Sequence, residues 1–156
     1  MKESPIFVKT QVFLVWLIER TERFRKSQRF GMALRLQDSI LDFMDCLIDA
    51  AKSRDPFKTL KRADVHLEKV RRYIRISVEL KLLSIRQYEY ASEHLVEIGK
   101  LLGGWMGSLR TGRRSNNQAI GSTTDKQTPR VAGRLLEQQH QELSVRQSQQ
   151  EQSRQP

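Results

Sequence analysis

The chain has 156 residues, a length that suits one domain of ordinary size. Lysine and arginine number 28 against 18 aspartate and glutamate residues, which gives a net charge of +10 at pH 7. This excess of positive charge points to a polyanionic partner, with nucleic acid favoured over an acidic protein or a membrane surface. The single cysteine, Cys46, excludes an intramolecular disulfide and suits a small core residue in a reducing compartment.

The longest unbroken apolar run covers residues 12–18 and is far shorter than the roughly 20 residues that a membrane span needs. No small-residue cleavage site of the kind found in signal peptides follows this run. We therefore expect a cytoplasmic protein that has no membrane partner.

We predict a first helix over residues 6–23, with Ser4 as its cap and Pro5 at its first position. Its apolar residues go most of the way round the helix: Phe7, Val8, Val12, Phe13, Leu14, Val15, Trp16, Leu17 and Ile18. A helix that is apolar on several sides is buried on several sides. Two explanations stay open, a subunit interface that includes Phe13, Trp16 and Leu17, or a broader core inside one chain.

A second helix is predicted over residues 28–53, with Ser27 as a candidate cap. The helical period is kept by Phe30, Ala33, Gln37, Ile40, Leu41, Met44, Leu47, Ile48 and Ala51. An acidic row on the outside of this helix consists of Asp38, Asp42, Asp45 and Asp49. Because no histidine or glutamate completes a ligand set, the row favours a solvated face, and we expect no metal or other cofactor.

The segment 56–81 predicts one long helix with two unlike faces, opened by Asp55 as its cap and Pro56. One face is apolar and consists of Leu60, Ala63, Leu67, Val70, Ile74 and Val78. The opposite face is mainly basic and carries Lys58, Lys61, Arg62, Lys69, Arg72 and Arg75. Eight lysine and arginine residues against three acidic ones leave +5 on this segment, half of the net charge of the chain.

A fourth helix is predicted over residues 85–108, where Ser84 and Gln87 have the spacing of a capping box. Its core stripe consists of Tyr88, Ala91, Leu95, Ile98, Leu102, Trp105 and Met106. Gly99 and Gly103, four residues apart, would permit a close approach of the backbone. Residues 109–156 are polar and end in a glutamine-rich stretch, which predicts a disordered tail. The fold class is therefore all-α, an antiparallel four-helix bundle over residues 4–108.

The sequence contains no catalytic constellation. His66, His94 and His140 lie on three different segments, and none has a neighbour at ligand or triad spacing. Neither a P-loop nor a nucleophile elbow is present, so we expect a protein that is not an enzyme.

The basic face of the third helix is the main functional feature of the sequence. Arg71 and Arg75 lie one turn apart, with Arg72 and Lys69 beside them, and Tyr73 offers a stacking surface. Lysine and arginine neutralise phosphates whatever the base sequence, so this face predicts affinity rather than base readout. The alternative is a solvated helix face that keeps the protein soluble.

The chain resembles the Avd family, the accessory variability determinants of diversity-generating retroelements, over roughly residues 4–108. The likeness lies in SPIFVKTQVFLVWLIERTERFRKSQRF at residues 4–30 and in RADVHLEKVRRYIRISVELKLLSIRQYEYASEHLVEIGKLLGGW at residues 62–105. It is also similar, more distantly, to four-helix-bundle proteins encoded in ribosomal RNA intervening sequences.

The resemblance implies a basic, pentameric barrel that binds the reverse transcriptase of the element and its template RNA and supports mutagenic retrohoming. The R-x-x-x-R pair of the family matches Arg71 and Arg75 here. We thus predict nucleic-acid contacts, to RNA and also to DNA, at Arg71, Arg75, Arg72, Lys69, Arg62 and Lys58. The second interpretation is an interaction bundle of the intervening-sequence type that binds no specific RNA.

Overall fold

The computed structural model describes residues 2–121, and the side chains of residues 2–115. The elements are α1 (Pro5–Glu22), α2 (Lys26–Gln28), the π-helical turn η1 (Arg29–Ala33), α3 (Leu34–Lys52), α4 (Pro56–Glu79) and α5 (Ile85–Gly121). No strand occurs among these described residues. The four long helices confirm the predicted all-α bundle. The chain divides into the compact units Met1–Arg113 and Arg114–Pro156, and every contact discussed below lies within the first.

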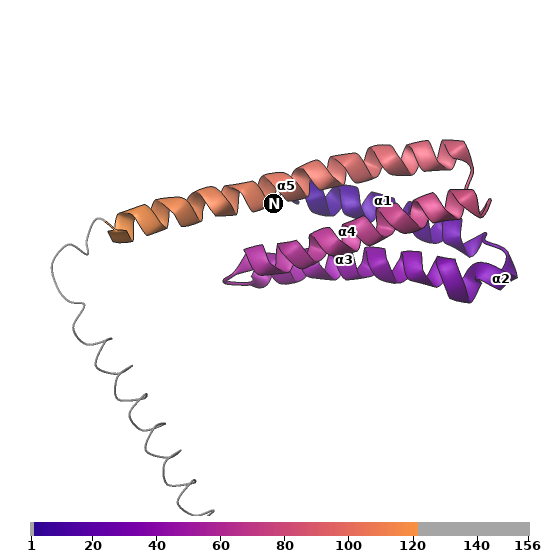
Figure 1. The fold of residues 1–156 in the computed structure, drawn as a ribbon, viewed down its shortest axis with the longest axis horizontal. Helices are drawn as coiled ribbons and strands as arrows, with labels where there is room; N and C mark the ends of the chain where they lie inside the picture. The colour runs from indigo at the N-terminus through magenta and orange to yellow at the C-terminus, as the bar shows by residue number, and fades with distance from the viewer. Residues whose placement is uncertain (1, 122–156) are drawn as a thin grey trace, which may run out of the picture. The chain divides into compact units, whose positions relative to one another are not determined.

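The four long helices form a bundle in which successive helices run antiparallel to one another (Figure 1). Polar side-chain contacts link neighbouring helices. Lys9 pairs with Glu97 between α1 and α5, and Gln37 bonds Thr21 between α3 and α1. Asp42 lies near His66 between α3 and α4, and Arg113 of α5 pairs with Asp55 at the start of α4. Short connections of three to five residues force successive helices to run in opposite directions.

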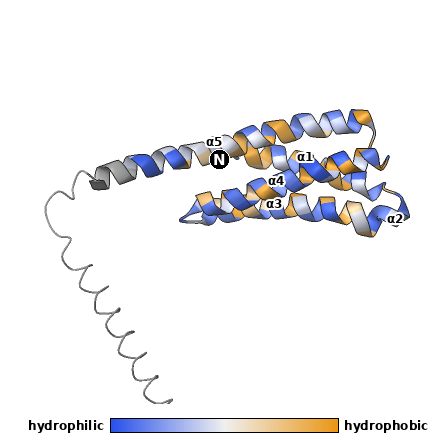
Figure 2. Cartoon of the chain, in the orientation of Figure 1, coloured by the Kyte–Doolittle hydropathy of each residue, from blue (hydrophilic) through white to orange (hydrophobic). Residues whose placement is uncertain are grey.

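The core forms where the apolar stripes of the four helices meet, and hydrophobic and hydrophilic residues alternate along α3 and α4 accordingly (Figure 2). The predicted stripe of α4 is confirmed, because Leu60, Ala63, Leu67, Val70 and Ile74 are all almost completely buried. The predicted stripe of α5 is confirmed by its buried residues Ala91, Leu95, Ile98 and Leu102. These two stripes leave the charged residues of both helices on the outside.

The end of α4 and the start of α5 have known capping motifs. At the start of α5, the Ser84 N–H donates to Gln87 Oε1 at 2.9 Å and the Gln87 N–H donates to Ser84 Oγ at 3.1 Å, which confirms the predicted capping box. At the end of α4, Lys81 adopts a φ of 58°, and the Leu82 N–H bonds the Ser77 carbonyl at 2.8 Å in a Schellman motif.

The start of the second long helix differs from the prediction. Ser27 caps nothing, because it lies inside the short α2, and η1 then inserts a π-helical turn. A π-helical turn shifts the phase of the residues on either side of it. Phe30 is therefore 90% exposed instead of facing the core. Leu41, Ile48 and Ala51 are exposed for a different reason, because the buried stripe of α3 is narrower than predicted and runs through Leu36, Ile40, Phe43, Leu47 and Ala50.

The last helix is longer than expected. The sequence predicts an end at residue 108, whereas α5 continues to Gly121. The first residues of the predicted tail, 109–121, are therefore helical. The rest of the predicted tail, residues 122–156, lies outside the described residues.

Shortening Leu67 to alanine is expected to lower the free energy of unfolding by about 2–5 kcal/mol, because the buried side chain leaves a cavity at the α4 seam. The measurement is urea denaturation followed by circular dichroism. Val65→Ala, at an exposed position two residues away, is the matched control and should change stability by no more than about 0.5 kcal/mol. Equal losses in both variants would contradict the assigned orientation of α4.

Candidate nucleic-acid interface

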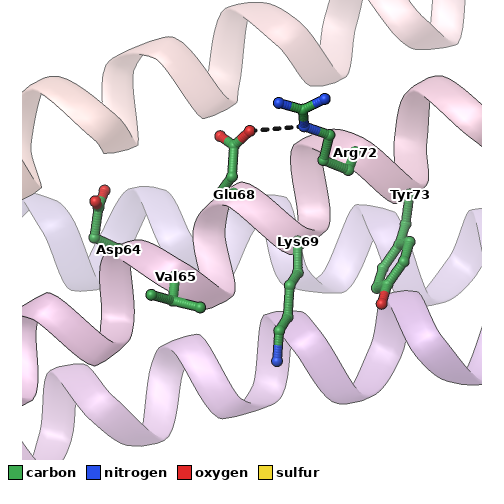
Figure 3. Close-up of a pocket in the computed structure, with 6 residues that line it drawn as sticks. All are labelled: Asp64, Val65, Glu68, Lys69, Arg72 and Tyr73. Atoms are coloured by element: carbon green, nitrogen blue, oxygen red, sulfur yellow. Dashed lines mark hydrogen bonds and ion pairs between the residues drawn. The ribbon is translucent and has the colours of Figure 1, made fainter.

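The outer surface of α4 carries the predicted contact residues, and an open hollow lies on it. The hollow is lined by Asp64, Val65, Glu68, Lys69, Arg72 and Tyr73, all from α4 (Figure 3). In this view Asp64, Glu68 and Arg72 project to one side of the helix and Val65, Lys69 and Tyr73 to the other. The charged rows on α4 are thus mixed in sign near its middle.

Glu68 pairs with two of the predicted contact residues. The Arg72 Nε–H donates to Glu68 Oε1 at 2.9 Å, and Arg71 Nη1 lies 3.5 Å from Glu68 Oε2. These hydrogen bonds, the one from Arg72 above all, lower the pKa of the Glu68 carboxyl below its usual value. Glu68 therefore stays ionised at neutral pH and neutralises part of the positive charge of this face.

Arg71 turns toward α5. A methyl group built on Gly99 would lie 2.5 Å from Arg71 Nη2 and 3.9 Å from Leu67 Cδ2, so the glycine makes room for the guanidinium. The Arg71 side chain is 36% exposed, compared with 68% for Arg72. The close approach predicted at the two glycines is therefore made at Gly99 by a side chain, whereas Gly103 faces open space.

The remaining predicted contact residues lie on the surface of α4. Arg75, Lys69, Arg62 and Lys58 are all exposed, and none forms an ion pair with a carboxylate in the described part of the chain. Of these four, only Lys69 lines the hollow. The structure therefore offers exposed cationic groups along α4 that are unpaired among the described side chains.

A cluster that the sequence analysis missed lies at the start of α4. Lys61, Arg110 and Arg113 all point their charged groups at the ring of Phe57. The spacing of Phe57 and Lys61, four residues apart on a helix, was visible in the sequence. The two arginines were not connected to it, because the last helix was expected to end at residue 108.

The predicted interface residues of α1 are mostly internal. Phe13 and Leu17 are 0% exposed and belong to the core of this chain, so they are not available to a partner subunit. Trp16 is half-buried and packs against Tyr90 of α5, with ring centroids 4.7 Å apart. The exposed apolar residues of α1 are Val8, Val12 and Val15, which share one face.

The described residues offer neither a metal site nor a membrane span. Among residues 2–121, no group of three or more histidine, cysteine, aspartate or glutamate side chains is placed to hold a metal ion. None of the helices over these residues combines the length and the apolar character needed to cross a bilayer.

Comparison with known proteins gives the family. A model of the bAvd-like family matches residues 6–109, which include nearly all of α1, all of α3 and α4, and α5 as far as residue 109. The chain belongs to the bAvd-like family. A search of curated proteins finds no match. The matched region of this bAvd-like chain includes Arg71, Arg75 and Gly99, whereas Arg110 and Arg113 follow directly after it.

Replacing Gly99 with alanine tests the position of Arg71. Glycine to alanine inside a helix gains about 1 kcal/mol of stability when nothing obstructs the new methyl group. We expect that gain for Gly103→Ala and a clearly smaller one for Gly99→Ala, because the Arg71 guanidinium has to move. Urea denaturation of both variants measures the difference. Equal gains would show that Arg71 is not seated against Gly99.

Proposed function

We propose that this chain is a non-enzymatic accessory subunit of a diversity-generating retroelement. In this role it binds the reverse transcriptase of the element, together with template RNA and cDNA, in the cytoplasm and supports mutagenic retrohoming. The polymerase chemistry belongs to the reverse transcriptase. The accessory subunit contributes a rigid surface on which nucleic acid is held.

The observation that carries this proposal is the match to the bAvd-like family over residues 6–109. The surface of α4 supports it, because exposed cations without a carboxylate partner among the described residues occur from Lys58 to Arg75. Cations of this kind neutralise phosphates and release counterions, which is the main source of affinity independent of base sequence. The resemblance to the Avd family further implies that Arg71 and Arg75 correspond to its R-x-x-x-R pair.

A second candidate function is a protein-interaction bundle of the ribosomal intervening-sequence type, without specific RNA binding. The pairing of Glu68 with Arg71 and Arg72 favours it, because charges already matched within the molecule are less available to a ligand. Salt dependence of RNA binding separates the two functions.

We also propose that the protein is a homo-oligomer, and the family resemblance implies a pentamer. Two rows of exposed apolar residues support self-association. Val8, Val12 and Val15 form one row on α1, and Leu34, Leu41 and Ile48 form another on α3 at a spacing of seven residues. Rows of this kind are typical of helical surfaces that pack against another helix.

RNA affinity is expected to fall steeply with salt and to weaken by on the order of tenfold in Arg71→Ala/Arg75→Ala. Fluorescence anisotropy with a labelled single-stranded RNA across a salt series provides the measurement. Unchanged affinity in the double variant would place the contact site elsewhere on the molecule.

Glu68→Gln provides the reverse test, because it releases Arg71 and Arg72 while keeping the shape of the side chain. This variant should bind RNA more tightly than Glu79→Gln, which removes the same charge from an exposed position on the same helix. Equal affinities for the two variants would mean that the two arginines do not contact the RNA.

Light scattering is expected to give a mass several times that of one chain, and Val12→Glu/Leu41→Glu is expected to shift it to that of a monomer. Both positions are exposed, so the charges enter the proposed interface and not the core. Arg86→Glu/Lys100→Glu, at exposed polar positions of α5, should leave the mass unchanged. A strictly monomeric wild-type protein at micromolar concentration would remove the barrel from the proposal.

A further inference from the structure

The start of α4 and the later part of α5 bring three cations to one aromatic ring. Lys61 Nζ lies 5.6 Å from the centroid of the Phe57 ring, Arg110 Cζ 5.3 Å and Arg113 Cζ 5.4 Å. Two of the cations come from α5 and one from α4, so the antiparallel packing of these helices assembles the cluster.

The cluster carries more positive than negative charge. Asp55 Oδ1 accepts a hydrogen bond from Arg113 Nη2 at 2.5 Å, and this is the only ion pair of the cluster among the described residues. Lys61 and Arg110 have no carboxylate partner in that part of the chain. Since all three groups lie near one centroid, no two of them are more than about 11 Å apart, a separation close to the Debye length of about 8 Å at physiological salt.

The Phe57 ring explains how three like charges are kept together without three acids. The face of an aromatic ring attracts cations electrostatically, which offsets part of their mutual repulsion. Held in this way, the cations lose less conformational freedom when an anion binds between them. A guanidinium group in addition presents its N–H donors in the fork geometry that matches phosphate oxygens.

We propose that Lys61, Arg110 and Arg113, held by Phe57, form a phosphate-binding site for the backbone of single-stranded RNA. The proposal rests on the proposed function as an RNA-binding subunit and adds a second contact point to it. Phe57 and Arg71 are separated along α4 by about 21 Å at about 1.5 Å per residue, so a strand that contacts both would follow the helix. We assign the Phe57 ring to holding the cations, since three of them already contact it.

The test compares full-length variants in anisotropy titrations with a labelled single-stranded RNA across a salt series. Arg110→Gln/Arg113→Gln should weaken binding by on the order of tenfold and reduce the slope of log K against log salt by about 1.4, or about 0.7 for each lost phosphate contact. Arg110→Lys/Arg113→Lys keeps the charge and should recover most of the affinity. Phe57→Leu keeps the three cations but not the aromatic face, and should weaken binding by a smaller factor.

The matched control is Arg86→Gln/Lys100→Gln, which removes two charges from exposed positions of the same helix. Circular dichroism confirms that each variant keeps its helical content. If the wild-type protein binds RNA and the Arg110/Arg113 glutamine variant loses no more affinity than the control, the site is wrong while the proposed function stands. If the wild-type protein shows no salt-dependent RNA binding, both fail. If the Arg110/Arg113 glutamine variant loses binding to phosphatidylserine vesicles while its RNA affinity is unchanged, the cluster binds lipid headgroups and the proposal is overturned.

Discussion

The burial of one apolar stripe on α4 is the constraint on which the rest of the structure depends. Leu60, Ala63, Leu67, Val70 and Ile74 recur at three- and four-residue steps and are almost completely buried. Each large side chain in such a stripe stabilises the fold by about 1.5–3 kcal/mol relative to exposure. The stripe therefore fixes the rotation of α4 about its axis, and with it the direction in which every lysine and arginine of this helix projects.

Ion pairs within α4 reduce the positive charge of its outer surface. Glu68 accepts from Arg72 and pairs with Arg71, which reduces the free positive charge near the middle of α4. These pairs are solvent-exposed and contribute little to stability, so their main effect is on what the surface presents to a ligand. Three cations from two helices gather instead around Phe57, and two of them, Lys61 and Arg110, have no carboxylate partner among the described residues.

Both α1 and α3 carry exposed apolar residues in addition to those that they bury in the core. The core takes Phe13 and Leu17 from α1, and it leaves valines on the opposite face exposed. On α3, the π-helical turn at Arg29–Ala33 turns Phe30 outward, and Leu34, Leu41 and Ile48 are exposed further along the helix. The burial of Phe13 and Leu17 supports the explanation of a broader core inside one chain, and the exposed valines leave a separate apolar row on the surface of α1.

The sequence by itself determined the four helices, the stripes of α4 and α5 and the capping box at Ser84, because helical period and capping depend on residues within a few positions of one another. It also predicted the exposed acidic row of α3 and the basic face of α4.

Only the tertiary structure decided that Arg71 lies against Gly99, that Phe13 and Leu17 are internal, and that Arg110 and Arg113 meet Phe57. Each of these contacts joins residues of different helices or depends on the phase of a whole helix, and both are set by packing rather than by local pattern. The position of Phe30 has the same cause, since a π-helical turn shifts the phase without a mark in the hydrophobic period.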